Sequence, residues 1–457
     1  MNKRILVKNA LVVSEKETIL NDILIENGII MQMASGLNVA DAQVIDAAYN
    51  YVTPGGIDAH VHLQLATAYG TIADNFTQGS IAALAGGTTT LIDFITPGRN
   101  ESLAEAAIKR KKEASGALID YALHGSVTAW HDNTAAEMKL LAEKEGITSF
   151  KVYMAYKKSI GIEDEVLFRT LRAAKTMGAV VLCHCENGEV IDVMQEEALN
   201  AGRVTPVNHA LTRPAETEAE AVNRALMMAG ITRAPLYVVH VSTKQGAMLI
   251  NKAKKNKLTV FAETCPHYLL LDDSAFNKTN PEQYIMSPPL RKPADRKYLW
   301  QALSNETIDV VSTDHCSYFL KDKLKGRRFT EVPNGVAGIE TRMALLASYG
   351  LTKDYININR FVALTAANPA RIFGLYPRKG VIAPGADADM VIWQQKRKII
   401  TAAALHQKTD HTVFEGFVCE VSPQTVIVNG RLGYHKGKLL TEGLKGRYLK
   451  RGKCEVG

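Results

Sequence analysis

Two features of the chain predict an α/β fold, a (β/α)8 TIM barrel with a second, smaller domain. Along the middle of the chain, eight short apolar runs rich in Val, Ile and Leu alternate with segments whose apolar residues recur at helical spacing. At the two ends of the chain the sequence predicts short strands joined by hairpin turns. We therefore expect a parallel barrel and, beside it, a β-sandwich-like domain formed from both termini.

Each strand of the barrel can be placed on the sequence. The expected strands are residues 51–63, 88–94, 119–127, 149–154, 179–186, 235–242, 258–265 and 308–314. The expected helices between and after them include residues 102–114, 135–145, 164–177, 216–229 and 338–350. Parallel neighbours require a crossover of this kind, so the alternation indicates a parallel sheet that closes on itself.

The terminal segments have the pattern of antiparallel hairpins. Turn dipeptides stand at Asn27-Gly28 near the start and at Asn429-Gly430 near the end. We expect residues 1–52 and 376–457 to form the composite β domain with a C-terminal extension, and residues 53–375 to form the barrel.

Composition narrows the class of protein. Hydrophobic residues make up 46% and charged residues 22% of the 457 residues, which is typical of a soluble globular protein. Six cysteines, several of them in apolar strands, predict buried thiols in a reducing compartment. Lys8 and Asn9 interrupt the first apolar run too early for a signal peptide. No apolar run reaches the roughly 18 residues that span a bilayer. We expect a cytoplasmic protein without a membrane partner.

The net charge of +7 is concentrated near the end of the chain. Residues 436–453 carry seven Lys or Arg against the single acid Glu442, so the rest of the chain is nearly neutral. This distribution does not predict a nucleic-acid partner. We expect the basic segment to be a solvated or subunit-contacting extension.

Five segments offer metal-ligand chemistry at the end of an expected strand. In a barrel the C-terminal ends of the strands converge on one mouth, so these residues become neighbours. Neutral imidazole and carboxylate suit zinc or a similar divalent ion. The residues are His60, His62, Lys151, His184, His240 and Asp314.

The individual residues also allow simpler interpretations. His60 and His62 stand at i and i+2, which places both rings on one face of a strand, whereas a lone histidine is more often a satisfied core residue. His184 and His240 can instead cap strands. Lys151 can be a paired buried cation, but burial also lowers the pKa of an amine, and a neutral amine can take up carbon dioxide to form a carbamate.

The motifs resemble those of one known family nearly end to end. Taken together, they resemble the dihydropyrimidinase/D-hydantoinase family (phenylhydantoinase-like) of the amidohydrolase superfamily. The motifs are GGIDAHVHL, AGGTTTLIDF, KVYMAY, HCENGEVI, ETCPHYLLLD, YIMSPPLR, VVSTDHC, PNGVAGIETR and KGVIAPGADADMVIW.

The resemblance implies two divalent metal ions, zinc in the first instance, although imidazole-rich sites also accept manganese or cobalt. His60, His62 and Asp314 would hold one ion. His184 and His240 would hold the other. Lys151, as N6-carboxylysine, and a hydroxide would bridge them.

The resemblance also implies a reaction, the opening of a dihydropyrimidine or 5-substituted hydantoin ring to an N-carbamoyl amino acid by a homotetramer. Tyr156 would hydrogen-bond the reacting carbonyl. Ser287 and Asn334 would grip the cyclic amide mainly through backbone groups. Asp314 would accept the proton of the hydroxide and deliver it to the leaving nitrogen. Taken without the resemblance, Tyr156 can be a packed aromatic and Ser287 a turn residue.

Two alternatives remain open from the sequence. An allantoinase or a dihydroorotase would share the metal site, but both usually carry an arginine just after the two histidines, where this chain has Leu63-Gln64-Leu65. A non-catalytic, dihydropyrimidinase-related structural protein would have lost ligands, and here every ligand position is filled. The natural substrate, the preferred enantiomer and the physiological metal stay undetermined.

Overall fold

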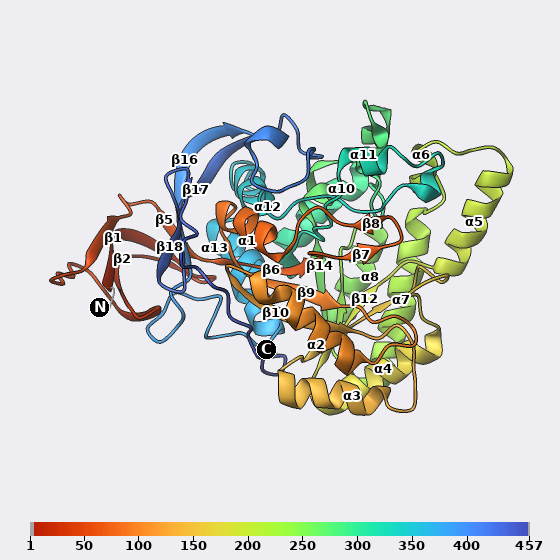
Figure 1. Ribbon diagram of the computed structural model, residues 1–457, viewed down its shortest axis with the longest axis horizontal. Coiled ribbons are helices and arrows are strands. Elements are labelled where there is room, and N and C mark those ends of the chain that lie inside the picture. Colours follow the sequence, from red (N-terminus) through yellow and green to blue (C-terminus); the bar gives the residue numbers. More distant parts are fainter. Residues whose placement is uncertain (1–3, 456–457) are drawn as a thin grey trace.

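The computed structural model describes residues 4–455 as a barrel with a separate β sheet beside it (Figure 1). Eight parallel strands, each hydrogen-bonded to the next, form the barrel. They are β6 (Gly56–Val61), β9 (Thr88–Ile95), β10 (Asp120–Ser126), β11 (Ser149–Tyr153), β12 (Val180–His184), β13 (Leu236–Val238), β14 (Val260–Thr264) and β15 (Val310–Val311). A parallel bridge between Val61 and His315 brings the last strand back to the first. The expected TIM barrel is confirmed.

Helices follow the strands and pack on the outside of the barrel (Figure 1). In α4 the residues Leu167, Leu171 and Ala174 recur at helical spacing and are buried. The main helices are α1 (Phe76–Ala85), α2 (Leu103–Glu113), α3 (Thr134–Leu140), α4 (Asp164–Met177), α5 (Gly188–Asn200), α7 (Ala215–Thr232), α8 (Lys244–Lys255) and α10 (Pro293–Ser304). Shorter helices are α6 (Val207–Leu211), α9 (Pro266–Leu270), α11 (Leu320–Lys323), α12 (Arg342–Leu346), α13 (Ile358–Val362) and α14 (Asn368–Ile372). The expected eighth helix is α12 together with a π-helical turn, Ala347–Leu351.

The two ends of the chain share one nine-stranded sheet. β5 pairs with both β1 and β16, and this pairing joins the N-terminal strands to the C-terminal ones. The strands are β1 (Arg4–Val13), β2 (Thr18–Glu26), β3 (Ile29–Ala34), β4 (Gln43–Asp46), β5 (Tyr51–Pro54), β16 (Met390–Ile399), β17 (Val418–Val428), β18 (Arg431–His435) and β19 (Lys438–Leu439). Both predicted hairpin turns are present, with Asn27 and Asn429 at φ 51° and 49° as such turns require.

A second sheet built from both termini is therefore confirmed, and it has a core of its own that includes Ile5, Ile23, Val52 and Ile392. The domain boundaries at residues 52/53 and 375/376 stay a prediction. Residues 1–3 and 456–457, which the predicted β domain includes, lie outside the described part of the chain.

The basic C-terminal segment is a solvated extension only in part: its lysines are exposed, whereas Leu449 and Arg451 are buried against the barrel. The expected subunit contact stays a prediction. Leu449 is fully buried in the cluster that fills the barrel interior, where it joins Phe373. Arg447 forms an ion pair with Asp120 at 2.6 Å. Arg451 donates a hydrogen bond to Ser149 Oγ at 2.8 Å. Asp120 at the start of β10 thus compensates the charge of Arg447, and the C-terminus lies beside the barrel rather than the terminal sheet (Figure 1).

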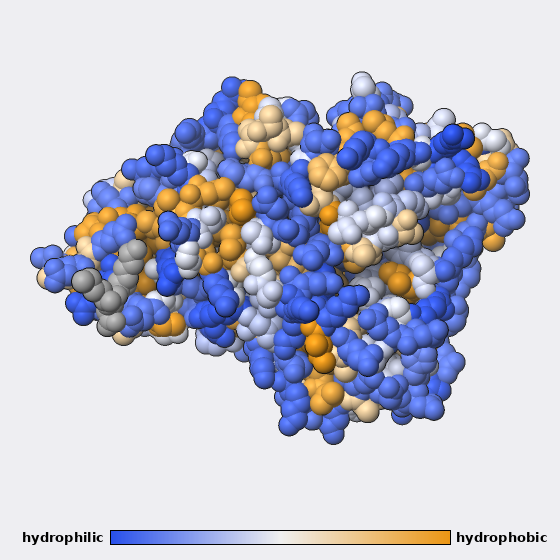
Figure 2. Space-filling model, in the orientation of Figure 1, coloured by the Kyte–Doolittle hydropathy of each residue, from blue (hydrophilic) through white to orange (hydrophobic). Residues whose placement is uncertain are grey.

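Apolar side chains gather over the terminal sheet on the face that Figure 2 shows, whereas the barrel helices there are largely hydrophilic. Exposed residues of this sheet include Ile19, Leu20 and Met31. Within residues 4–455 no helix combines the length and apolar character needed to cross a bilayer.

The role of the C-terminal segment can be tested at Leu449. We expect Leu449→Ala to lower the free energy of unfolding by about 2–5 kcal/mol, because it removes a buried side chain from the barrel interior. Urea denaturation measures the change. Lys445→Ala, which alters an exposed residue of the same segment, is the control and should stay within about 0.5 kcal/mol of the parent. Equal stability of the two variants would contradict this packing.

Candidate metal centre

The six predicted ligands gather at the C-terminal mouth of the barrel. Four imidazoles form a continuous row: the ring centres of His62 and His60 are 5.3 Å apart, those of His60 and His240 5.5 Å, and those of His240 and His184 4.5 Å. His60 lies in β6 and His184 ends β12, while His240 follows β13. Strand ends that are distant in sequence therefore supply one cluster.

Three of these residues form a compact group. Asp314 Oδ1 lies 3.1 Å from His60 Nε2 and 3.2 Å from His62 Nε2. One ligand atom from each residue falls within 4.8 Å of the others, a spacing that suits a metal ion. The backbone of Asp314 has φ 48°. A left-handed conformation in a residue other than glycine is typical of functional sites.

The other three residues include polar atoms without partners. His240 Nδ1 is buried and accepts or donates no hydrogen bond within the described chain. Lys151 is 1% exposed, and no hydrogen bond or ion pair reaches its amine from residues 4–455. Its Nζ lies 5.3 Å from the ring centre of Phe94. Burial lowers the pKa of Lys151 to about 8.

A buried imidazole nitrogen without a hydrogen-bond partner is available to a metal ion. Imidazole nitrogens, a carboxylate and an amine that can become a carbamate suit two divalent ions. The residues present therefore fit a two-metal centre.

Comparison with known proteins identifies the family. Residues 51–433 match the amidohydrolase family. The D-hydantoinase of Geobacillus stearothermophilus is 41% identical over 454 residues, which are 98% of this chain and 96% of that protein. The chain belongs to the amidohydrolase family. Amidohydrolases generally depend on a binuclear metal centre.

Solved structures of hydantoinases and dihydropyrimidinases share this fold over nearly the whole chain. The dihydropyrimidinase of Brevibacillus agri NCHU1002 has a TM-score of 0.98 and 38% identity, covering 99% of this chain and all of that one. The L-hydantoinase (dihydropyrimidinase) of Arthrobacter aurescens has a TM-score of 0.91 and 27% identity with the same coverage.

His60 is oriented by a glutamate for which the sequence predicted no role. Glu263, at the end of β14, contacts His60 Nδ1 through Oε1. Its Oε2 accepts a hydrogen bond of 2.7 Å from the Tyr237 hydroxyl. Both His60 and Glu263 are almost wholly buried. This contact leaves His60 Nε2 free to face the Asp314 carboxylate, which is how carboxylates commonly orient metal-binding histidines.

The same contacts explain the charge state of the centre. Burial alone lowers the pKa of His60, but the carboxylates of Glu263 and Asp314 outweigh it and raise the pKa to about 9. Conversely, burial raises the pKa of Asp314, and the two histidines beside it hold that pKa well below its usual range. Without a metal, a proton on His60 therefore compensates the buried carboxylates, and a metal ion must displace that proton.

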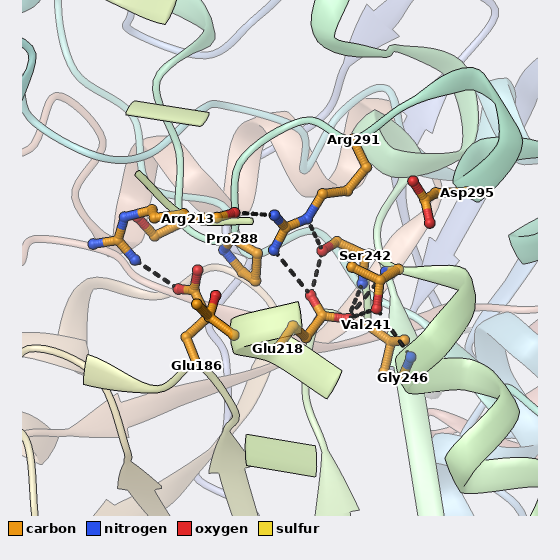
Figure 3. Close-up of polar contacts among 12 residues, drawn as sticks. Glu186, Arg213, Glu218, Val241, Ser242, Gly246, Pro288, Arg291 and Asp295 are labelled. Carbon is orange, nitrogen blue, oxygen red and sulfur yellow. Dashed lines mark hydrogen bonds and ion pairs between the residues drawn. The ribbon is translucent and has the colours of Figure 1, made fainter. Parts of the chain in front are cut away.

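A second carboxylate orients His184. Glu186 Oε2 lies 2.8 Å from His184 Nε2 and accepts a hydrogen bond of 2.8 Å from Arg213 (Figure 3). Burial raises the pKa of Glu186, while Arg213 and His184 lower it more. The carboxylate thus stays charged. The spacing of Glu186 two residues after His184 was a visible signal, whereas Arg213 could not be paired with it from sequence.

A buried network behind this pair joins three functional segments (Figure 3). Arg291, four residues after Ser287, donates a hydrogen bond to Ser242 Oγ at 2.9 Å and another to the Arg213 carbonyl. Glu218 accepts hydrogen bonds from the backbone of Ser242 at 3.1 Å and of Thr243 at 3.0 Å. The loops that follow His240 and Ser287 are thereby fixed against the arginine that supports Glu186.

The predicted substrate-binding residues lie beside the His184 end of the row. The Tyr156 ring is 5.1 Å from the His184 ring. Burial raises the pKa of Tyr156, so its hydroxyl keeps its proton and can donate. Tyr156 and Asn334 line a cavity of about 180 Å³ together with His209. Ser287 Oγ lies 3.4 Å from His209 Nε2.

A hairpin of β7 (Ala66–Thr67) and β8 (Gly70–Thr71) covers one side of this cavity. Tyr69 at its tip lines the cavity and donates a hydrogen bond to the Thr330 carbonyl at 3.2 Å. The structure therefore brings all the predicted ligands and substrate-binding residues to one mouth.

The support of His60 by Glu263 gives a direct prediction. We expect Glu263→Gln to weaken metal binding about 10- to 100-fold, because an amide orients the imidazole less strongly and does not enhance its basicity. Competition with a chromogenic chelator measures the affinity. Tyr237→Phe removes only the hydroxyl that supports Glu263, and it should have the smaller effect. Unchanged metal affinity in Glu263→Gln would show that the carboxylate does not support the centre.

Proposed function

We propose that this protein is a binuclear metal-dependent cyclic amide hydrolase, which opens dihydropyrimidine or 5-substituted hydantoin rings to N-carbamoyl amino acids. The observation that carries the proposal is the gathering of His60, His62 and Asp314 at the barrel mouth, near the buried Lys151 and near His240, whose Nδ1 has no hydrogen-bond partner among residues 4–455. The full-length similarity to a protein named D-hydantoinase supports the substrate class.

The proposed centre uses every predicted ligand. His60, His62 and Asp314 would hold one ion, and His184 and His240 would hold the other. Lys151, carboxylated to N6-carboxylysine, would contribute to both. When bound, the two ions, zinc or alternatively manganese or cobalt, supply a nucleophile near neutral pH and polarise the ring carbonyl. The low pKa of Lys151 supports carboxylation, since only the neutral amine forms the new N–C bond with carbon dioxide, releasing a proton.

The side chains around the centre divide the remaining chemistry. The Tyr156 hydroxyl donates a hydrogen bond to the carbonyl oxygen as negative charge develops there. Asp314 accepts the proton of the attacking water and delivers it to the ring nitrogen as the C–N bond breaks. Backbone groups at Ser287 and Asn334 hold the ring in the orientation that this transfer requires.

In this proposal the fold does not determine which enantiomer of a substituted hydantoin the enzyme prefers. Proteins named D-hydantoinase and L-hydantoinase both share the architecture. The hairpin around Tyr69 and the turn at Tyr156 line the cavity, and in this proposal they contact the ring substituent.

We also propose a cytoplasmic homotetramer without a nucleic-acid partner. Five of the six cysteines are buried and all six are free, which suits a reducing compartment. Exposed apolar side chains on α5 and α7, among them Val193, Met227 and Ile231, suit subunit contacts. The exposed lysines of the C-terminal segment are also available for such contacts. Light scattering on the purified protein tests the assembly.

The first experiment is ring opening of dihydrouracil, hydantoin and both enantiomers of phenylhydantoin, with metal content measured on the same sample. We expect turnover of at least one of these with about two metal ions per chain. Allantoin and dihydroorotate are assayed in parallel. If only one of these is hydrolysed, the protein is an allantoinase or a dihydroorotase instead. Absence of both turnover and metal would favour a non-catalytic structural relative.

The bridging role is tested at Lys151. We expect Lys151→Ala to abolish ring opening and the binding of two ions, because no other described side chain can replace both carbamate oxygens. Short carboxylic acids added to the variant should restore part of the activity. Lys139→Ala, which alters a lysine on the barrel exterior with 64% of its side chain exposed, is the control and should behave as the parent. Two tightly held ions in Lys151→Ala would exclude the bridge.

A further inference from the structure

Lys323 is a buried cation outside the metal centre. It ends the short helix α11 and is 0% exposed. Its amine donates hydrogen bonds of 2.9 Å to the carbonyls of Ile285 and Pro333. The carbonyl of Glu282 lies at 3.5 Å. An ammonium has three N–H donors, so these three carbonyls match its full capacity.

The carbonyls belong to the two segments that carry the substrate-binding residues. Ile285 stands two residues before Ser287, and Pro333 immediately precedes Asn334. The Gly335 amide donates a hydrogen bond of 3.1 Å to the same Ile285 carbonyl. One side chain and one peptide group therefore hold the two segments side by side.

Packing alone does not explain a lysine at this position. Within residues 4–455 no carboxylate forms an ion pair with Lys323, and burial lowers its pKa to about 7. An unpaired buried ammonium is costly, whereas an apolar side chain of similar length would fill the same space without that cost. What lysine adds is a fixed set of hydrogen bonds to backbone carbonyls from separate segments.

We propose that Lys323 is a positioning residue for substrate binding, which sets the spacing between the Ser287 and Asn334 segments that grip the cyclic amide. It touches neither the reacting atoms nor a metal ligand. The proposal rests on the proposed function for the identity of the substrate. The hydrogen bonds by which Lys323 joins the two segments, called the clamp below, belong to the fold. They can be tested without substrate.

The first test is amide hydrogen exchange in Lys323→Met, a neutral variant of similar length. We expect faster exchange in both residues 282–287 and residues 333–336, including the Gly335 amide. The matched control is Lys321→Met, which removes the same charge from an exposed position on the same helix. Exchange in the two segments at the parent rate, in a folded Lys323→Met protein, would overturn the clamp.

The second test is steady-state ring opening of hydantoin by the same variants with metal content measured. We expect KM to rise about tenfold in Lys323→Met with kcat within about threefold of the parent, because substrate binding weakens while the metal centre is intact. Lys323→Arg, which keeps a cationic donor, should recover part of the loss. A lowered kcat at unchanged KM, or loss of metal, would overturn the positioning role.

The two measurements separate the two proposals. A parent protein that opens no cyclic amide contradicts the proposed function, while the exchange experiment still decides the clamp. If Lys323→Met does not fold, Lys323→Gln, which has a shorter side chain with two N–H donors, takes its place. In Lys323→Gln both the amide exchange rates and KM should rise, by less than expected for Lys323→Met. Exchange rates and a KM equal to those of the parent would overturn the proposal.

Discussion

The buried contact between His60 and Glu263 is the constraint on which the metal centre depends. Both side chains lie at the mouth of a closed barrel, where neither charge can be satisfied by water. The glutamate fixes one imidazole nitrogen and leaves the other facing Asp314. The contact thus fixes which nitrogen of His60 faces the candidate metal position, with a carboxylate on either side of the ring.

The same arrangement recurs at the other end of the histidine row. Glu186 supports His184 and is itself held by Arg213. Behind them, Arg291 and Glu218 connect the loops after β13 and after Ser287. His60 and His184 therefore each contact a buried glutamate, and each glutamate is held by a further side chain, Tyr237 or Arg213. Within this network Glu218 and Glu263 are hydrogen-bonded through both carboxylate oxygens, whereas Glu186 Oε1, Arg213 Nε and Arg291 Nη2 have no hydrogen-bond partner among residues 4–455.

The sequence alone predicted the parts of this centre that have a local signal. Strand periodicity placed His60 and His62 on one face, and the position of His184, His240 and Lys151 at strand ends predicted their convergence. The partners have no such signal. His60 and Glu263 are 203 residues apart, and nothing in the apolar run around Glu263 shows which side chain it contacts. Resemblance to a family supplied Tyr156, Ser287 and Asn334, which periodicity could not.

The C-terminal segment shows why charge runs are hard to interpret from sequence. Its lysines and arginines have the pattern of a solvated tail, yet Arg447 and Arg451 bind Asp120 and Ser149 and enclose Leu449. Lys323 illustrates the same principle inside the fold, because its partners are carbonyls and backbone carbonyls leave no trace in a sequence. Three of the predicted ligands, His60, Lys151 and His184, lie within barrel strands held by regular backbone pairing, whereas the segments of Ser287 and Asn334 are joined by the buried Lys323 amine. A change at Lys323 can therefore alter these two segments while the residues in the strands keep their positions.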